Sequence, residues 1–316
     1  MMESDMTCMG FQYEIGKEYI LKDELKLCCN GFHFCENPFE CLEYYNNIEG
    51  DKRLFLVEAL GEVITEDNKS VTNKIKIIEE IKDIEKFFDE NIKNFKVRWY
   101  IISVYQKLSE EFIEKHYDKV NWDRISEYQT LSEKFIEKHG DKIDWEYISE
   151  YQKLSEEFIE KHVDKVKWKC ISRCQTLSEK FIEKYKNKVD WVWISRCQKL
   201  SEEFIEKHCD KVDWGRISSN QKLSEEFIEK HCDKLDWDYI SYYQILSDDF
   251  IEKHGDKVNW VYISQYQKLS EEFIEKYSDK VYWDYISKHQ TLSKKFIRKH
   301  NIISWLKKLL RKVTKK

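Results

Sequence analysis

The sequence predicts a mainly α-helical fold, an α-solenoid of two-helix 23-residue repeats with a small α+β domain at its N-terminus. The first observation is a motif that returns in strict register along most of the chain. The second is composition, because one proline and eight glycines in 316 residues favour helices joined by short connections. The third is that the first 78 or so residues do not repeat and alternate in polarity as strands do.

The repeat is marked by a tryptophan that recurs every 23 residues without a slip. These tryptophans are Trp99, Trp122, Trp145, Trp168, Trp191, Trp214, Trp237, Trp260 and Trp283. The approximate consensus is D-W-x-x-I-S-x-Y-Q-x-L-S-E-E-F-I-E-K-H-x-D-K-V, and its Leu and Phe keep the same period. We expect the recurrent apolar residues to form the core, because a unit that cannot bury its apolar face alone buries it against its neighbours.

Each repeat is predicted to contain two short helices. Asn121 or Asp144 before the tryptophan is a favourable N-cap, and Ser109 in "LSEE" is a second one, followed by two glutamates that complement the helix dipole. Isolated helices shorter than ~12–15 residues are marginal in water, so stacking of the repeats must supply their stability.

Four regions follow along the chain. Residues 1–78 are expected to form the α+β head domain, and residues 79–98 an N-terminal capping helix related to the repeats. Residues 99–293 form the helical array, and residues 294–316 a basic amphipathic C-terminal capping helix. In the head, "RLFLVEALGEVIT" and "NKIKII" are typical of strands, and "CCNGFHFCENPFECLEYY" of a strand, a turn and a helix.

Charge is distributed unevenly. The net charge is −6, but the last 23 residues contain ten basic residues and no acidic one. The rest of the chain therefore carries −16, from 44 basic and 60 acidic residues. The basic tail includes Lys307, Lys308, Arg311 and Lys312, which would lie opposite an apolar helix face that caps the last repeat. An anionic membrane surface and a nucleic acid are two alternative contacts for it.

Positions that differ among the repeats are the candidates for partner binding. In the central repeats they combine basic and aromatic residues, and spacing by one helical turn brings them onto one surface. The residues of this predicted site are Lys167, Lys169, Arg173, Trp193, Arg196 and Arg216. Such a combination is typical of a surface that binds an acidic protein or a nucleic acid. Neutral variation on a solvent-exposed face is the alternative.

Recurrent polar residues are not expected to be catalytic. The recurrent His of "EKH" is replaced by Tyr185 and Tyr277, which suits a half-buried ring better than a metal ligand or a base. The recurrent Glu, Lys and Asp are expected to form a solvated face. In the head, a cluster of Cys and His residues has no recognised zinc spacing, so we expect no metal and no cofactor. The cluster comprises Cys28, Cys29, His33, Cys35 and Cys41.

The head segments and the repeats each resemble sequences of known families. "GFQYEIGKEY", "CNGFHFCENPFECLEYY" and "LFLVEALGEV" resemble an uncharacterised small N-terminal domain of bacterial, phage and large-virus proteins. The repeats are similar to "LSEEFIEK…DKVDW…IS" arrays of giant viruses, phages and AT-rich bacteria. The resemblances imply a viral or mobile-element setting and no particular activity. "GFHFCENPFECLEYY" is also similar to segments of some ADP-ribosyltransferases, which would imply an enzymatic head.

These observations predict a non-enzymatic scaffold that binds a protein or ribonucleoprotein. One concrete form is a viral or phage factor that inhibits a host defence complex such as a CRISPR nuclease. A second contact is expected in the head, at His33, Glu36, Tyr44 and Tyr45. The alternatives are an enzyme whose head is catalytic and whose array selects substrates, and nucleic-acid binding through the central basic residues and the tail.

The expected location is the cytoplasm, of the host cell if the protein is viral. The first residues lack the apolar core of a secretory signal, and no apolar run is long enough to span a membrane. The ten cysteines are therefore expected to be reduced thiols.

Overall fold

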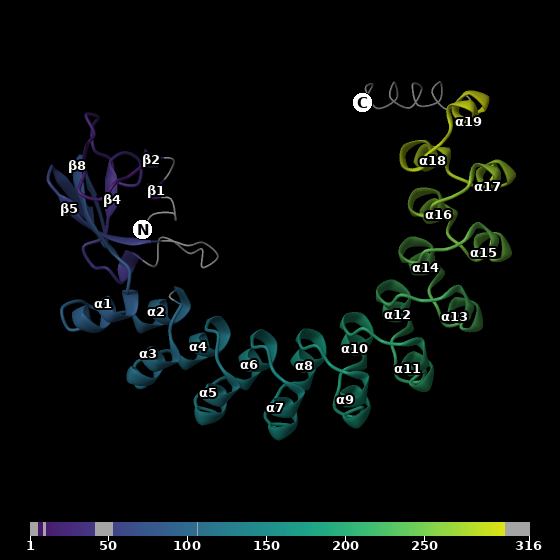
Figure 1. Ribbon diagram of the computed structural model, residues 1–316, viewed down its shortest axis with the longest axis horizontal. Coiled ribbons are helices and arrows are strands. Elements are labelled where there is room, and N and C mark those ends of the chain that lie inside the picture. The colour runs from purple at the N-terminus through teal and green to yellow at the C-terminus, as the bar shows by residue number, and fades with distance from the viewer. Residues whose placement is uncertain (1–5, 9–10, 42–52, 106, 301–316) are drawn as a thin grey trace. The chain divides into compact units, whose positions relative to one another are not determined.

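The computed structural model describes residues 6–8, 11–41, 53–105 and 107–300. The chain divides into two compact units, Met1–Val166 and Lys167–Lys316. The first, unit 1, contains a β-rich head followed by helical repeats, and the second, unit 2, contains helical repeats (Figure 1). This confirms the predicted α-solenoid with a small α+β head.

The head is built from antiparallel strand pairs. One three-stranded sheet has the order β3-β8-β5, with β3 at Glu18–Ile20, β8 at Lys74–Ile81 and β5 at Leu54–Ala59. A second has the order β4-β7-β6, with β4 at Phe32–Phe34, β7 at Lys69–Thr72 and β6 at Val63–Glu66. A short pair joins β1 (Thr7–Cys8) to β2 (Phe11–Gln12). The predicted strands are therefore present.

Glycine is required where the chain enters β4. Gly31 has φ +127°, and a Cβ atom there would lie 2.2 Å from a methyl carbon of Val71. Phe32 follows it and is buried with Val71 and Ile77 in the head core. His33, the next residue, points outward and is exposed, as the alternation of a strand predicts.

The boundary between head and array differs from the expected one. β8 runs on to Ile81, so residues 79–81 are strand and not part of a capping helix. Pairing with β5 accounts for this, because Leu54 lies opposite Ile81 and extends the ladder. The capping helix α1 (Ile84–Asn91) begins after Asp83, whose side chain accepts a hydrogen bond from the Lys86 N–H.

Every repeat contributes two helices of six or seven residues. The first, which we call the Trp helix, begins at the recurrent tryptophan, and the second, the Phe helix, carries the recurrent phenylalanine. In unit 1 the Trp helices are α2 (Trp99–Tyr105), α4 (Trp122–Tyr128) and α6 (Trp145–Tyr151). The Phe helices of unit 1 are α3 (Glu110–Lys115), α5 (Glu133–Lys138) and α7 (Glu156–Lys161).

Unit 2 continues the same pattern. Its Trp helices are α8 (Trp168–Cys174), α10 (Trp191–Cys197), α12 (Trp214–Asn220), α14 (Trp237–Tyr243), α16 (Trp260–Tyr266) and α18 (Trp283–His289). Its Phe helices are α9 (Glu179–Lys184), α11 (Glu202–Lys207), α13 (Glu225–Lys230), α15 (Asp248–Lys253), α17 (Glu271–Lys276) and α19 (Lys294–Lys299). Residues 294–299 are thus the Phe helix of the last repeat and do not begin a separate capping helix.

The two kinds of helix form two layers in each unit. Consecutive Trp helices pack directly against one another, whereas consecutive Phe helices approach less closely (Figure 1). Ile194 of α10 and Ile205 of α11 are fully buried between the layers, and their equivalents in the other repeats are buried in the same way, except that Ile297 of α19 is only half-buried. The predicted core is confirmed, and the variable positions of the Trp helices are left at the surface, apart from Cys170, which is buried.

The recurrent glutamine connects each repeat to the one before it, which the sequence did not predict. The Gln198 side chain is buried, and its Nε2 donates to the carbonyls of Ser172 (3.0 Å) and Gln175 (2.7 Å). Its Oε1 accepts from the backbone N–H of Leu177 at 2.9 Å. One side chain therefore satisfies three buried backbone groups of the preceding repeat.

The recurrent serine of the Trp helix connects each repeat to the next. Ser195 is buried. Its hydroxyl donates to the Trp191 carbonyl (2.7 Å) and accepts a hydrogen bond from the Asp213 N–H (3.0 Å) of the next repeat. The serine therefore bonds both within its own helix and to the next repeat. It also fixes the start of the following Trp helix.

Candidate partner-binding surface

The recurrent charged residues take part in contacts between repeats. Glu183 of α9 accepts hydrogen bonds from Lys207 (3.0 Å) and His208 (2.6 Å) of the next repeat. These contacts, with Lys186, lower the pKa of Glu183 to about 2, and the hydrogen bond from Lys207 has the largest effect. The expectation of a merely solvated face is therefore incomplete, because these side chains also join consecutive Phe helices.

The ring of the recurrent histidine packs against the recurrent Trp and Phe rings of its own repeat. The His208 ring centroid lies 4.9 Å from that of Trp191 and 4.5 Å from that of Phe204. Tyr185 occupies the same place, 5.0 Å from Trp168, in a repeat without the histidine. The ring was expected to be half-buried, and His208 is more deeply buried than that, at 4% exposed, because it packs between Trp191 and Phe204.

The predicted central site forms a cation–aromatic stack. The guanidinium carbon of Arg173 lies 5.4 Å from the Trp193 ring centroid, and that of Arg196 lies 5.3 Å from it. Trp193 is half-buried, and the two arginines that contact its ring come from α8 and α10. Cation–π contacts of this kind stabilise by about 0.5–1 kcal/mol at exposed sites, so the stack presents an ordered guanidinium pair.

The remaining residues of the predicted site lie on the same Trp-helix layer. Lys169 is exposed on α8, and Arg216 on α12 is half-buried. Lys167 is exposed at the N-cap of α8, where its side chain makes no capping hydrogen bond. We call the six residues Lys167, Lys169, Arg173, Trp193, Arg196 and Arg216 the Arg–Trp patch. The Arg173–Trp193–Arg196 contacts make up its ordered centre.

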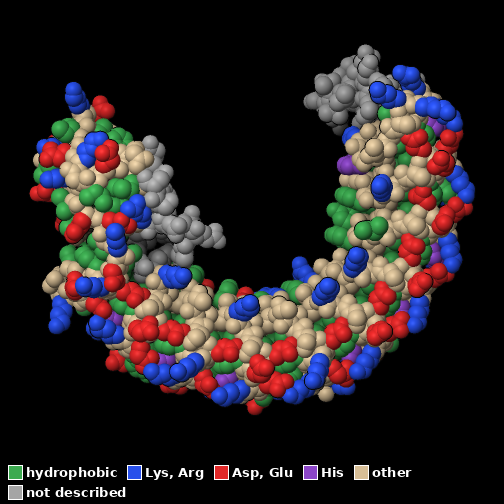
Figure 2. All heavy atoms as spheres, in the orientation of Figure 1, with side chains coloured by type: hydrophobic (Ala, Val, Ile, Leu, Met, Phe, Trp, Pro, Cys, Tyr) green, Lys and Arg blue, Asp and Glu red, His purple; other side chains and the backbone are tan. Residues whose placement is uncertain are grey.

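The charge of the Trp helices changes along the chain. α8, α10 and α12 contain four basic residues and no acidic one. α4 and α6 of unit 1 instead carry four acidic residues and one arginine, Arg124, which forms an ion pair with Glu127. In unit 2, Asp and Glu side chains gather with lysines on the side of the Phe helices (Figure 2). The Arg–Trp patch is therefore a cationic region that avoids carboxylates on its own helices.

The predicted second contact in the head is only partly described. His33 Nε2 accepts a hydrogen bond from the Cys28 N–H at 2.9 Å. The Glu36 carboxylate accepts from the hydroxyls of Thr65 and Ser70, both at 3.4 Å. The two side chains thus have separate hydrogen-bond partners. Tyr44 and Tyr45 lie outside the described residues, as do Lys307, Lys308, Arg311 and Lys312 of the tail.

Two head cysteines interact. A hydrogen bond from the Cys35 thiol lowers the pKa of Cys41 to about 7, and the same contact, with burial, raises the pKa of Cys35. Across the described part of the chain, no three His, Cys, Asp or Glu side chains are grouped as metal ligands.

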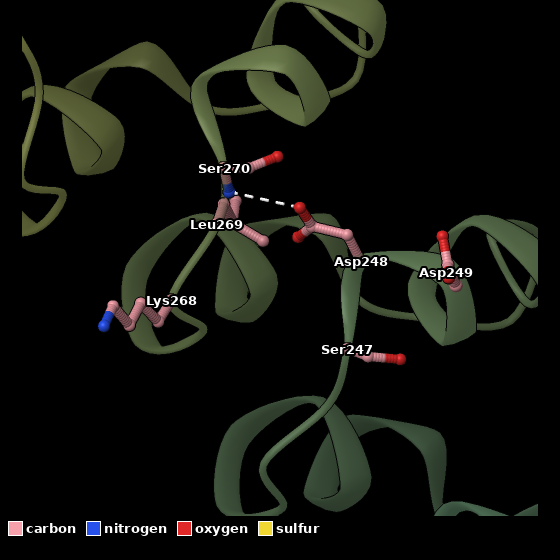
Figure 3. A pocket seen from close by; sticks show the side chains of 6 residues that line it. All are labelled: Ser247, Asp248, Asp249, Lys268, Leu269 and Ser270. Atoms are coloured by element: carbon pink, nitrogen blue, oxygen red, sulfur yellow. Dashed lines mark hydrogen bonds between the residues drawn. The ribbon is translucent and has the colours of Figure 1, made fainter.

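A hollow of about 420 Å³ lies between two repeats of unit 2 (Figure 3). Its lining residues are Ser247, Asp248, Asp249, Lys268, Leu269 and Ser270. Asp248 accepts from the Ser270 N–H at 3.2 Å, whereas Glu225 at the equivalent position contacts both the N–H (2.6 Å) and the hydroxyl (3.1 Å) of Ser247. The shorter aspartate leaves a gap at an ordinary repeat junction, and this hollow lacks the converging polar groups of a ligand site.

Comparison with known protein families finds a match for the first part of the chain. Residues 1–90 match the family described as "Domain of unknown function (DUF7666)". The matched segment includes the strands of the head and most of α1. No curated protein and no solved structure matches the chain. Among the described helices, none combines the length and apolar character needed to cross a membrane.

Proposed function

We propose that this protein is a non-enzymatic repeat scaffold that binds an anionic surface of a protein or ribonucleoprotein through the Arg–Trp patch. The observation that supports this proposal is the stack of Arg173 and Arg196 on Trp193, on helices without acidic residues. Arg and Trp are enriched among residues that dominate binding energy in protein interfaces. A preordered arginine pair also loses little conformational freedom when it meets a carboxylate or phosphate.

The recurrent and the variable residues of the repeats make different contacts, and this difference adds support to the proposal. The recurrent Gln, Ser, Glu and Lys bond to neighbouring repeats, as do histidines such as His208, so substitution there would disturb the array itself. The Arg–Trp patch occupies positions that vary between repeats and face outward. The resemblance of the repeats to giant-virus and phage arrays makes a host defence complex, such as a CRISPR nuclease, a concrete partner to test first.

The test is an affinity pull-down from the source cell with the full chain and two charge-reversed variants. In the patch variant, Arg173, Arg196 and Arg216 become Glu. In the control variant, Lys180, Lys294 and Lys295 become Glu, which introduces the same charge change on Phe helices and restores the consensus "SEE" residues. The proposal expects one partner that both wild type and control retain and that the patch variant loses.

Retention of the partner by the patch variant would refute the proposal and direct attention to the head. Nuclease treatment before elution separates the two partner classes. A partner that disappears with nuclease is bound through nucleic acid, and one that persists is bound as protein.

A further inference from the structure

A tyrosine cluster extends along the Trp helices beyond the Arg–Trp patch. The Tyr242 ring on α14 has centroid distances of 4.3 Å to Tyr243, 5.3 Å to Tyr262 and 4.1 Å to Tyr266. Tyr243 is 54% exposed and Tyr266 is 45% exposed. The rings are thus ordered by mutual contact while large parts of their surface remain in solvent. Exposed aromatic surface of this kind marks interaction sites.

An exposed isoleucine borders this cluster. Ile245 follows α14 after one residue and is 87% exposed, the most exposed large apolar side chain among the described residues. The equivalent position is Lys199, Lys222 or Lys268 in other repeats of unit 2. A solvated lysine is therefore compatible with the fold at this position, and the isoleucine is not needed for packing.

The cluster and the Arg–Trp patch belong to one continuous surface. α12, which carries Arg216, packs directly against α14. The contact between Tyr242 and Tyr262 uses the same two repeat positions as the contact between Arg173 and Trp193. The surface therefore has a cationic half on α8, α10 and α12 and an aromatic half on α14 and α16.

We propose that this surface binds an extended protein segment in which an acidic block adjoins an apolar block, with the acidic block on α8–α12 and the apolar block on α14–α16. The inference rests on the proposed function and names the partner's chemistry. Five adjacent Trp helices at a spacing of roughly 8–10 Å cover about 32–40 Å, which an extended chain spans with about ten to twelve residues.

The separation of charge from aromatic surface favours a protein over a single-stranded nucleic acid. Nucleic acids need cations along the same path as the stacking rings, because each stacked base brings its own phosphate. α14 and α16 contain no Lys or Arg, and α14 carries Asp238. A phosphate backbone would therefore lie beside tyrosines without positive charge and near a carboxylate. Tyrosine supplies large contact area at low entropic cost in protein interfaces.

Unit 1 offers a matched control for the tyrosines. Tyr128 and Tyr151 occupy the same repeat positions as Tyr243 and Tyr266 and are 44% and 54% exposed. Each has a glutamate as its preceding residue in the chain, and these carboxylates raise the pKa of both tyrosine hydroxyls. The control pair is thus equally exposed but lies in an acidic setting that should repel an acidic segment.

The experiment is selection of a displayed library of random 16-residue peptides on the immobilised full chain. The proposal expects enriched peptides with an Asp/Glu block next to a Leu-, Phe- or Trp-containing block. The affinity of the best peptide is then measured by fluorescence anisotropy, and circular dichroism confirms the fold of each variant. The variants are Y243A/Y266A, I245K, R173E/R196E and the control Y128A/Y151A.

We expect Y243A/Y266A and R173E/R196E each to weaken peptide binding by at least about tenfold, as removal of interface hot spots does. I245K, which restores the common lysine of the repeats, should weaken it by about threefold or more, since it removes one apolar contact. Y128A/Y151A should leave it within about twofold.

Three outcomes would overturn the inference. One is enrichment of no peptides with adjoining acidic and apolar blocks. Another is loss of peptide affinity in R173E/R196E but not in the tyrosine or isoleucine variants, which would leave the proposed function standing alone. The third is tighter binding of a 20-nucleotide oligo(dT) probe that Y243A/Y266A weakens, which would assign the surface to nucleic acid. If no variant changes binding, both proposals fail.

Discussion

Replacement of Gln198 by alanine should weaken the junction between the repeat of α8 and α9 and the repeat of α10 and α11. The Gln198 amide donates to two carbonyls, at 3.0 and 2.7 Å, and accepts from the Leu177 N–H at 2.9 Å. All three partners belong to the preceding repeat, and Gln198 itself is only 5% exposed. Alanine removes the three hydrogen bonds at once without touching the apolar core.

The expected cost follows from the groups left behind. A buried N–H without a partner, here that of Leu177, costs about 1–3 kcal/mol. The two carbonyls each lose one acceptor contact but keep a second lone pair, so their share is smaller. A loss of roughly 2–5 kcal/mol in the free energy of unfolding is therefore expected, which is large for a polar side chain that contacts only backbone.

Urea unfolding followed by circular dichroism and hydrogen exchange at the Leu177 amide would measure the effect. In a repeat array, stability is a sum of repeat and interface contributions, so the weakened junction should also broaden the transition. Lys199→Ala, at the exposed neighbouring position, is the control and should change stability by less than about 0.5 kcal/mol. A Q198A protein as stable as K199A, with unchanged exchange at Leu177, would refute the assignment of the glutamines as interface residues.

Three further predictions concern the contacts between repeats. In Asp248→Glu the longer side chain should contact both the N–H and the hydroxyl of Ser270, which would raise the free energy of unfolding by about 0.5–1.5 kcal/mol in urea titrations. An unchanged urea midpoint would contradict our explanation that the short aspartate leaves the hollow. Burial lowers the pKa of His162 and His254, so the stability that the two neutral rings contribute is fully present above about pH 6.5 and is lost as the pH falls below it. H162Y/H254Y should therefore flatten the dependence of the free energy of unfolding on pH between about pH 7 and pH 5. An unaltered pH dependence would contradict this role of the two histidines. Hydrogen bonds, chiefly from Lys207, lower the pKa of Glu183, so its contribution is present above its ordinary value of 4.5 and is lost as pH falls towards about 2. E183Q should therefore reduce the difference in urea midpoint between about pH 5 and pH 3, and a difference equal to that of the wild type would show that this carboxylate does not contribute.

The architecture was predictable because its determinants are local. The 23-residue period, the Ser109 and Asn121 caps and the buried Phe and Ile positions all follow from residues close together in sequence, and each is confirmed. The glutamine and serine contacts were not predictable in the same way. Gln198 bonds to groups 21 to 26 residues earlier, and such partners become visible only when the stacking distance and rotation of the repeats are known.

The candidate surface was predicted only in part, for a related reason. Spacing by one helical turn indicated that Arg196 would lie near Trp193, but the contact of Arg173 with the same ring depends on how α8 packs against α10. The tyrosine cluster is harder to predict, because Tyr243 and Tyr266 belong to the consensus and only their contacts with Tyr242 distinguish them from the same residues of other repeats. Two signals in the sequence were Tyr242, at a position that is charged or polar in most other repeats, and Ile245, at a position that is often lysine.

The contacts between repeats also support our proposal of the Trp-helix face as the binding surface. A polar residue that bonds to the next repeat, such as Ser195, contributes to two repeats, so its replacement weakens both. The outward positions of the Trp helices are free of the recurrent Gln and Ser contacts, and they differ between basic, acidic and aromatic residues from one repeat to the next. In unit 2 this freedom yields an Arg–Trp patch followed by tyrosines, an order along the array that can specify the direction of a bound segment as well as its composition.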